Sequence, residues 1–302
     1  MRECGETAAA EPELAHPVEV VEPSVFRSPL VLSSPHSGCA YPKSFLSASR
    51  LDPAQLRRSE DAFVDELFAG AYLSGAPLVR AIFPRAFLDA NREPFELDPR
   101  MFDGRLPAHA NTRSLRVAAG LGTIARLVAE SQEIYARRLP VEAALRRIAA
   151  VYRPYHGALR RLTQRAQKSF GLSVLVDCHS MPSVVAGVGG AERIRTDFVL
   201  GDRYGTSCDP DLTATVEAEL KRRGYTVQRN KPYAGGFITE HYGNPASNAH
   251  ALQIEINRGV YMSEATFEKL PAFPKLTQDL TAVIATLSEA AQGLASWRSA
   301  AE

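Results

Sequence analysis

Three polar side chains interrupt apolar, strand-like runs that lie far apart in the sequence. His36 follows VLSS in the segment PHSG, His179 follows SVLV in DCHS, and Glu255 stands inside LQIEIN. Burying such groups is costly unless each has a partner. Two histidines and a carboxylate from neighbouring strands would satisfy one another through a divalent cation. The pattern therefore suggests a metal-dependent hydrolase.

Zinc accepts two histidines and a carboxylate, and in catalytic sites it keeps a fourth position for water. His36 and His179 stand where predicted strands end, which is where sites form in open α/β sheets. A carboxylate near His36 should complete the set, and the following predicted helix carries Glu60, Asp61 and Asp65. Asp61 and Asp65 would share one helix face. We favour Asp61 as the third ligand, with Glu60 next.

Each of these residues also has a purely structural interpretation. A histidine at a strand end is more often a hydrogen-bonded polar residue than a ligand, and an acidic residue on a helix usually faces solvent. Two histidines that each end an apolar strand beside a serine strengthen the case for a metal. Both interpretations stay open at this level.

Glu255 lies in a segment where apolar and polar residues alternate, over residues 252–258. A sheet covered on both sides would bury its polar face, so a carboxylate there needs an explanation. One is pairing with a cation such as Arg258 or Arg92. The other is a general base that takes a proton from water and delivers it to a leaving amine. The residues alone do not separate these two.

A group of arginines surrounds the segment FLDANREP, at 87–94. Asn91 and Arg92 end a short predicted strand, Arg85 precedes it and Arg113 follows in an irregular loop. The planar fork of arginine matches a carboxylate through two hydrogen bonds, and asparagine adds a directional donor. The group could bind an anionic substrate, although surface arginines are common in this chain.

Tyr233 lies in a loop over 231–245 that contains two adjacent glycines. This loop could form a lid over a site, or simply connect two elements. His156 stands on a predicted helix, where it could support the site from behind or lie on the helix surface. Cys39, three residues after His36, could be a ligand or a reactive thiol.

The amino-acid composition limits the classes of binding partner that we expect. A formal charge of +1 over 302 residues gives no reason to expect nucleic acid or an anionic membrane. Apolar stretches fall short of the roughly 20 residues that a membrane span needs, and residues 1–20 do not look like a signal peptide. The four cysteines form no CxxC pair, and a reducing cytoplasm is the expected setting. Oligomeric state is left open.

Strand and helix patterns alternate along the chain and predict an α/β protein. Its sheet should be mixed, mostly parallel and flanked by helices on both faces. Residues 1–22 read as a flexible tail and 23–302 as a single domain. The expected strands span 28–36, 77–83, 86–91, 172–180, 197–202, 225–230 and 250–258; the helices span 53–72, 120–168 (broken near Pro140 and Pro154), 210–223 and 263–296. Residues 93–115 and the glycine-rich 181–196 should be loops.

Eight segments, in this order, resemble the N-formylglutamate amidohydrolase family. They are SPHSG, SEDAFVDELF, FLDANREP, YRPYHGAL, LVDCHSMPS, DFVLGD, KPYAGGFITEHYG and LQIEINRGVYM, and they span about 28–263. The family is related in fold to zinc carboxypeptidases and aspartoacylase-type deacylases. The resemblance therefore implies a carboxypeptidase-like fold and one Zn²⁺, or another divalent metal, per chain.

The resemblance also implies roles for individual residues. His36 and His179 match two metal ligands, Glu255 matches the catalytic glutamate, and Asn91-Arg92 looks like the pair that holds a substrate carboxylate in carboxypeptidases. The chain differs from the carboxypeptidase pattern at one of the ligand positions.

Carboxypeptidases take two ligands from a compact HxxE, but the corresponding position here is Cys39. The carboxylate ligand must then come from elsewhere, and the segment with Glu60 and Asp61 carries the family's recurring aspartate.

The implied activity is hydrolysis of the amide bond of a small N-acyl amino acid. N-formyl-L-glutamate is the expected substrate, with formate and glutamate as products, which fits late histidine breakdown. Two alternatives remain. The same site could serve a carboxypeptidase or an aspartoacylase-type deacylase, or the fold could persist as a non-catalytic small-molecule binding protein.

Overall fold

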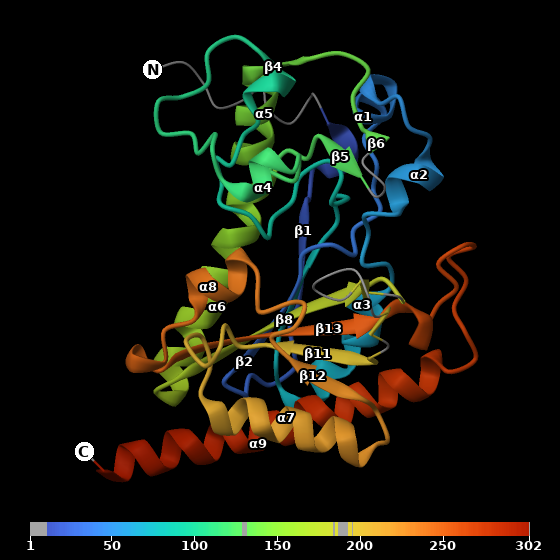
Figure 1. Ribbon diagram of the computed structural model, residues 1–302. Coiled ribbons are helices and arrows are strands. Elements are labelled where there is room, and N and C mark those ends of the chain that lie inside the picture. The colour runs from blue at the N-terminus through green and yellow to red at the C-terminus, as the bar shows by residue number, and fades with distance from the viewer. Residues whose placement is uncertain (1–10, 129–131, 184, 187–192, 195, 302) are drawn as a thin grey trace. The chain divides into compact units, whose positions relative to one another are not determined.

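The computed structural model describes residues 11–128, 132–183, 185–186, 193–194 and 196–301 (Figure 1). Contacts within the chain divide it into two compact units. Unit 1 draws on the chain up to Glu19, on Pro35–Glu60 and on Arg80–Ala158, and unit 2 on Val20–Ser34, Asp61–Val79 and the chain from Leu159 onward. The single domain over 23–302 stays a prediction.

Unit 2 contains most of a seven-stranded sheet, and the division between the units passes through its strands β1 and β3. The pairs β2–β8, β8–β13 and β11–β12 are parallel, and β11–β13 is antiparallel. The predicted mixed, mostly parallel sheet is confirmed. In spatial order the strands are β1 (Val18–Val21), β3 (Leu78–Ala81), β2 (Leu30–Ser34), β8 (Ser173–Met181), β13 (Ala249–Asn257), β11 (Phe198–Gly201) and β12 (Val227–Arg229).

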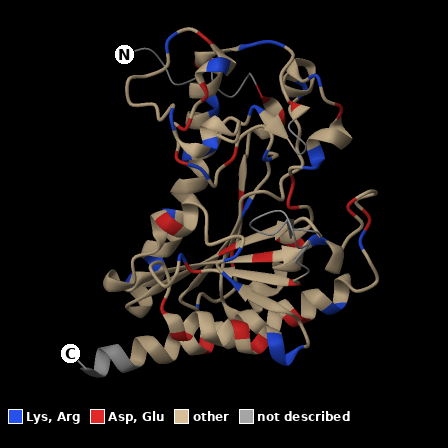
Figure 2. Cartoon of the chain, viewed as in Figure 1, with Lys and Arg blue, Asp and Glu red and all other residues tan. Residues whose placement is uncertain are grey.

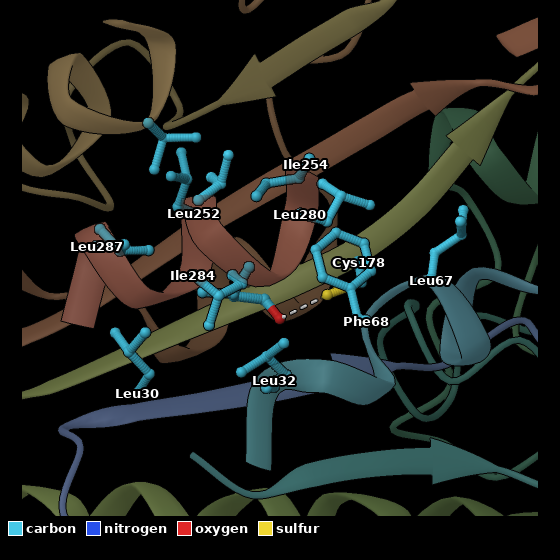
Figure 3. Packing of buried hydrophobic residues seen from close by; sticks show 14 of the residues in the cluster. Leu30, Leu32, Leu67, Phe68, Cys178, Leu252, Ile254, Leu280, Ile284 and Leu287 are labelled. Atoms are coloured by element: carbon cyan, nitrogen blue, oxygen red, sulfur yellow. Dashed lines mark hydrogen bonds between the residues drawn. The ribbon is translucent and has the colours of Figure 1, made fainter. Parts of the chain in front are cut away.

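One face of this sheet carries the main hydrophobic core (Figure 3). Successive side chains of a strand point to opposite faces, and in β2, β8, β13 and β11 the apolar even-numbered residues enter the core. They pack against α9 (Phe273–Ala301), α7 (Pro210–Arg222) and α3 (Val64–Leu67), for example Leu252 and Ile254 with Leu280 and Ile284. Cys178 lies in this core, as its strand pattern predicts.

The odd-numbered residues of the same strands lie on the opposite face, and this face carries the polar residues of interest. The helix α8 (Phe237–Tyr242) contacts β13 and β8, and the N–H of Gly236 just before it donates to Gln253 Oε1 at 2.7 Å. Leu159 and Leu162 of α6 (Arg153–Phe170) are buried outside the main core. Helices flank both faces, as predicted.

Unit 1 consists of short elements joined by long connections. Its strands form two small pairs, β4 with β7 and β5 with β6. Its elements are α1 (Lys43–Ala48), α2 (Pro53–Arg57), a 3₁₀ turn (Pro99–Met101), β4 (Phe102–Asp103), α4 (Leu115–Ala118), β5 (Leu127–Val128), β6 (Gln132–Glu133), β7 (Leu139–Pro140), α5 (Val141–Arg147), a π-helical turn (Ile148–Tyr152) and the start of α6.

The helix predicted over 53–72 is wrong in its middle. Asp52 caps α2 as expected, but α2 ends at Arg57, α3 begins at Val64, and a 3₁₀ helix follows over Ala69–Ser74. Phe63, in the break, has the left-handed φ of 65°. Tertiary hydrogen bonds of the acidic residues in this break, described below, override the helical pattern.

The helix predicted over 120–168 begins only at Val141. Before it, Gly120 has φ of 76°, and a Cβ on Gly122 would lie 2.2 Å from the carbonyl oxygen of Glu96. Such a close backbone approach needs glycine and forms a turn instead of a helix. A π-helical turn directly precedes Arg153-Pro154, where the sequence predicts a break or kink.

Further differences between prediction and structure are local. The predicted loop over 231–245 contains the helix α8 (Phe237–Tyr242). Residues 86–91 form turns instead of a strand, and the C-terminal helix begins at Phe273 instead of 263. Residues 18–21 of the predicted tail form β1, and residues 1–10 lie outside the described part of the chain. Much of the predicted loop over 181–196 also lies outside it. Within the described residues, no helix has the length and apolar character to cross a bilayer.

The core packing predicts the effect of truncating a buried leucine. Leu252→Ala should lower the free energy of unfolding by about 2–5 kcal/mol, because it removes buried methyl groups and leaves a cavity. Leu73→Ala, the same change at a side chain that is 54% exposed, should change it by no more than about 0.5 kcal/mol. Urea unfolding followed by circular dichroism measures both, and equal losses would contradict the assignment of this core.

Candidate functional site

The register of β8 and β13 places two predicted site residues side by side. His179 pairs with Glu255 and Asp177 pairs with Gln253 in the parallel ladder. Neighbouring strands are about 4.8 Å apart, and all four side chains belong to the face opposite the main core. Unit 2 therefore gathers a buried histidine and acidic residues on two adjacent strands.

His179 is held by a carboxylate at each ring nitrogen. Its Nδ1 lies 3.0 Å from Asp61 Oδ2, and its Nε2 lies 2.8 Å from Asp177 Oδ2. Burial alone would lower the pKa of His179, but the charge of Asp177 and the hydrogen bonds with Asp177 and Asp61 raise it well above its ordinary value. The imidazole therefore has a fixed orientation.

Asp61 lies in the break between α2 and α3, and its carboxylate is buried. Besides contacting His179, it accepts from Ser180 Oγ at 3.2 Å and from Arg258 Nη2 at 3.1 Å. These hydrogen bonds hold the chain in the turn at Asp61, which explains why the predicted helix is interrupted there.

The other two acidic candidates lie in different surroundings. Glu60 is buried in unit 1, where it accepts from Tyr41 Oη at 2.5 Å and from Arg57 Nε at 3.1 Å. Asp65 is a half-buried residue of α3. Asp61 contacts the predicted ligand His179, and this contact favours Asp61 over Glu60 and Asp65 as the carboxylate ligand.

Glu255 is buried, 7% exposed, and accepts a hydrogen bond from Gln253 Nε2 at 2.8 Å. Gln253 is oriented in turn by the N–H of Gly236. Arg258, one of the predicted cation partners of Glu255, bonds Asp61 and Ser180. The carboxylate of Glu255 is thus positioned by an amide, beside His179 in the ladder.

In unit 1, His36 contacts a carboxylate that the sequence interpretation missed. Its Nε2 lies 2.7 Å from Asp89 Oδ1, and both residues are buried. Arg85 Nε and Arg92 Nη2 approach Asp89 Oδ2 at 3.1 and 3.3 Å. Burial alone would raise the pKa of Asp89, but the charges of Arg92, His36 and Arg85 lower it well below its ordinary value.

The glycine of PHSG has a steric role. A Cβ on Gly38 would lie 2.2 Å from the carbonyl oxygen of Phe83. Nearby, the N–H of Ala40 donates to the carbonyl of Ile82 at 3.0 Å. The segment after His36 therefore packs against backbone at a distance that only glycine allows.

The backbone around Asn91 and Arg92 is held by two aromatic side chains. Tyr152 Oη donates to the carbonyl of Arg92 at 2.7 Å, and His156 Nε2 lies 2.8 Å from the carbonyl oxygen of Ala90. The two rings stack with centroids 4.2 Å apart. His156 is buried, so its predicted helix-surface position is wrong, and its supporting role stays a prediction.

The two histidines share one arrangement, in which a buried carboxylate holds Nε2. Asp89 does this for His36 and Asp177 for His179. Carboxylates in this position are typical partners of metal-binding histidines, because they fix the ring and its tautomer. The other ring nitrogen of His179, Nδ1, contacts Asp61, which is itself a predicted ligand. Both aspartates stand in polar interruptions of apolar runs, FLDANREP and LVDCHS, and this was the available sequence signal.

The remaining predicted residues have less specific surroundings. Arg113 is exposed on the loop before α4, Tyr233 is partly exposed, and Cys39 is exposed. Their predicted roles stay predictions.

Comparison with known proteins gives concordant results. The sequence model of the family described as "FGase: N-formylglutamate amidohydrolase" matches residues 28–262. An N-formylglutamate deformylase of Pseudomonas putida is 30% identical over 79% of this chain and 83% of its own length.

Two solved structures extend this comparison. The crystal structure of an N-formylglutamate amidohydrolase from Ralstonia eutropha JMP134 matches with a TM-score of 0.85 and 38% identity, over 90% of this chain and 97% of that one. A gene product of Agrobacterium tumefaciens matches with a TM-score of 0.60 and 17% identity, over 90% and 95% of the two chains, which concerns the fold alone.

The contact between His179 and Asp177 can be tested by titration. Asp177→Asn should lower the pKa of His179, because the neutral amide no longer stabilises the imidazolium. NMR titration of the His179 ring in metal-free protein measures this shift. Asp211→Asn, at an exposed aspartate of α7, is the matched control. A His179 pKa that is the same in Asp177→Asn and wild type would contradict the arrangement.

Proposed function

The chain belongs to the N-formylglutamate amidohydrolase family, and from this premise we propose that it hydrolyses N-formyl-L-glutamate to formate and glutamate. The observation that carries the proposal is that Glu255 lies opposite a buried histidine, His179, in the ladder of β13 and β8. Asp61 and Asp177 hold this histidine in place. A rigid imidazole beside a buried carboxylate is suited to activating water against an amide.

The ligand set of the proposed reaction is His36, Asp61 and His179. All three are buried and each offers one ligand atom. Two imidazoles and a carboxylate suit a catalytic zinc, and the carboxylates on both Nε2 atoms support the fit. A divalent cation held there would supply Lewis-acid activation of the formyl carbonyl and of water.

Glu255 is proposed as the proton carrier. Its carboxylate takes a proton from the attacking water as the new C–O bond forms, and returns it to the amine nitrogen as the C–N bond breaks. Gln253 orients Glu255 through its amide hydrogen bond. Formate and the free amino group of glutamate are the products.

Arg92 and Asn91 are proposed to hold a substrate carboxylate, with Arg85, Arg113 and Tyr233 as further candidates. Support comes from the Arg92 guanidinium, whose Nε donates to the carbonyl of Leu121 at 2.8 Å and whose Nη2 lies 3.3 Å from Asp89 Oδ2, since a fixed guanidinium binds a carboxylate with less loss of entropy. Asp89 keeps the guanidinium groups of Arg85 and Arg92 close together.

Activity and metal dependence can be measured together. Purified protein should release formate from N-formyl-L-glutamate, a chelator should reduce the rate at least about 100-fold, and added Zn²⁺ should restore it. Formate release that is unaffected by complete metal removal would refute the metal-dependent mechanism.

Substrate class is tested in the same assay. N-acetylaspartate and short peptides should be cleaved more slowly than N-formyl-L-glutamate. Faster cleavage of either would assign the site to an aspartoacylase-type deacylase or a carboxypeptidase. Absence of both hydrolysis and metal binding would indicate a non-catalytic binding protein.

The role of Glu255 predicts a selective loss of turnover. Glu255→Gln should lower kcat by about 10²–10⁴-fold with little change in bound metal, because the amide cannot carry the proton. Glu289→Gln, the same change at an exposed glutamate of α9, should leave kcat unchanged. Steady-state kinetics with metal analysis measures both, and a Glu255→Gln enzyme of near-normal kcat would exclude Glu255 as the proton carrier.

A further inference from the structure

Unit 1 contains a hollow of about 160 Å³ whose wall is rich in arginine. None of the proposed metal ligands and none of the proposed substrate-binding residues lines it. Figure 2 shows that basic and acidic residues are interspersed in this unit, so the arginines of the hollow must be compared with the carboxylates around them. The lining consists of Arg50, Arg100, Met101, Arg126, Glu133, Tyr135, Ala136, Arg137 and Arg138.

Backbone pairing holds these segments in place. Ser49 and Tyr135 form an antiparallel bridge, and the N–H of Arg50 donates to the carbonyl of Ile134 at 2.8 Å. The strands β4 and β7 pair with each other; β4 follows directly after Met101 and β7 directly after Arg138, and both of these residues line the hollow. The hollow is therefore built by ladder hydrogen bonds between segments distant in sequence, and its shape does not depend on one loose loop.

Three carboxylates accompany the five guanidinium groups. Glu133 lies 3.3 Å from Arg50 and 3.5 Å from Arg126. Asp98 binds Arg100 at 2.7 Å and Arg126 at 3.0 Å, and Asp103 lies 3.9 Å from Arg138. Five positive groups against these three negative ones leave an excess of two positive charges among the described residues.

We propose that this hollow binds a small tetrahedral oxyanion of double negative charge, namely inorganic phosphate or a phosphate monoester. Such a ligand balances the two excess positive charges. Arg137 and Arg138 are exposed at the hollow, and they supply two adjacent guanidinium forks.

Geometry favours a tetrahedral ligand over a carboxylate. A planar carboxylate is satisfied by one or two forks, as Asp98 shows with Arg100 and Arg126. Arginines from several separate segments line the hollow, and such a wall instead suits an anion with acceptor oxygens in more than one plane. The binding does not depend on the reaction proposed above.

The test is calorimetric titration of the full-length protein with inorganic phosphate, at an ionic strength held constant with sodium chloride. Parallel titrations use glycerol phosphate as the monoester and succinate as a dicarboxylate. The variant R137Q/R138Q removes two guanidinium groups, and R137K/R138K keeps their charge but removes the forks. R146Q, at an exposed arginine of α5 outside the wall of the hollow, is the control for loss of a surface positive charge.

We expect saturable phosphate binding that weakens at least about tenfold in R137Q/R138Q and is unchanged in R146Q. R137K/R138K should lie between wild type and R137Q/R138Q. The relative affinities of phosphate and glycerol phosphate identify which of the two the hollow prefers. Absence of saturable binding, equal binding in R137Q/R138Q and wild type, or succinate binding as tight as phosphate binding would each overturn the proposal. Circular dichroism of each variant confirms folding, and formate release is recorded separately, so failure of one proposal is distinct from failure of the other.

Discussion

The buried contact of His179 with two carboxylates is the interaction on which unit 2 is organised. Asp177 reaches the imidazole from the same strand, and Asp61 reaches it from a turn 118 residues earlier in the chain. Three ionisable groups in an apolar interior would be strongly destabilising without one another. Arg258, Ser180 and neighbouring groups complete the hydrogen bonding, so that this polar cluster is compatible with a tightly packed sheet.

Side chains of successive residues lie on opposite faces of the sheet, and this alternation separates the polar cluster from the hydrophobic core. Apolar even-numbered residues of the central strands enter the hydrophobic cluster with α7 and α9, and the odd-numbered positions hold His179, Asp177, Gln253 and Glu255. Burial of the apolar face provides the stability that the polar face lacks.

Unit 1 contains a second histidine whose Nε2 is held by a buried aspartate. Asp89 holds His36 as Asp177 holds His179, but Asp89 also gathers Arg85 and Arg92. One carboxylate thus fixes both a predicted metal ligand and a predicted anion-binding arginine. This coupling explains why the segment forms turns where the apolar pattern of residues 86–91 predicts a strand.

The sequence by itself determined the sheet class, most of its strands and the family. The apolar run before His179 and the alternation over 252–258 depend only on neighbouring residues, and they also revealed His179 and Glu255 as polar residues in buried strands. Tertiary structure decided that Asp61 leaves the helical pattern, that Asp89 and Asp177 hold the histidines, and that His179 lies opposite Glu255. Those outcomes depend on strand register and on hydrogen bonds between distant segments, and a local pattern contains neither.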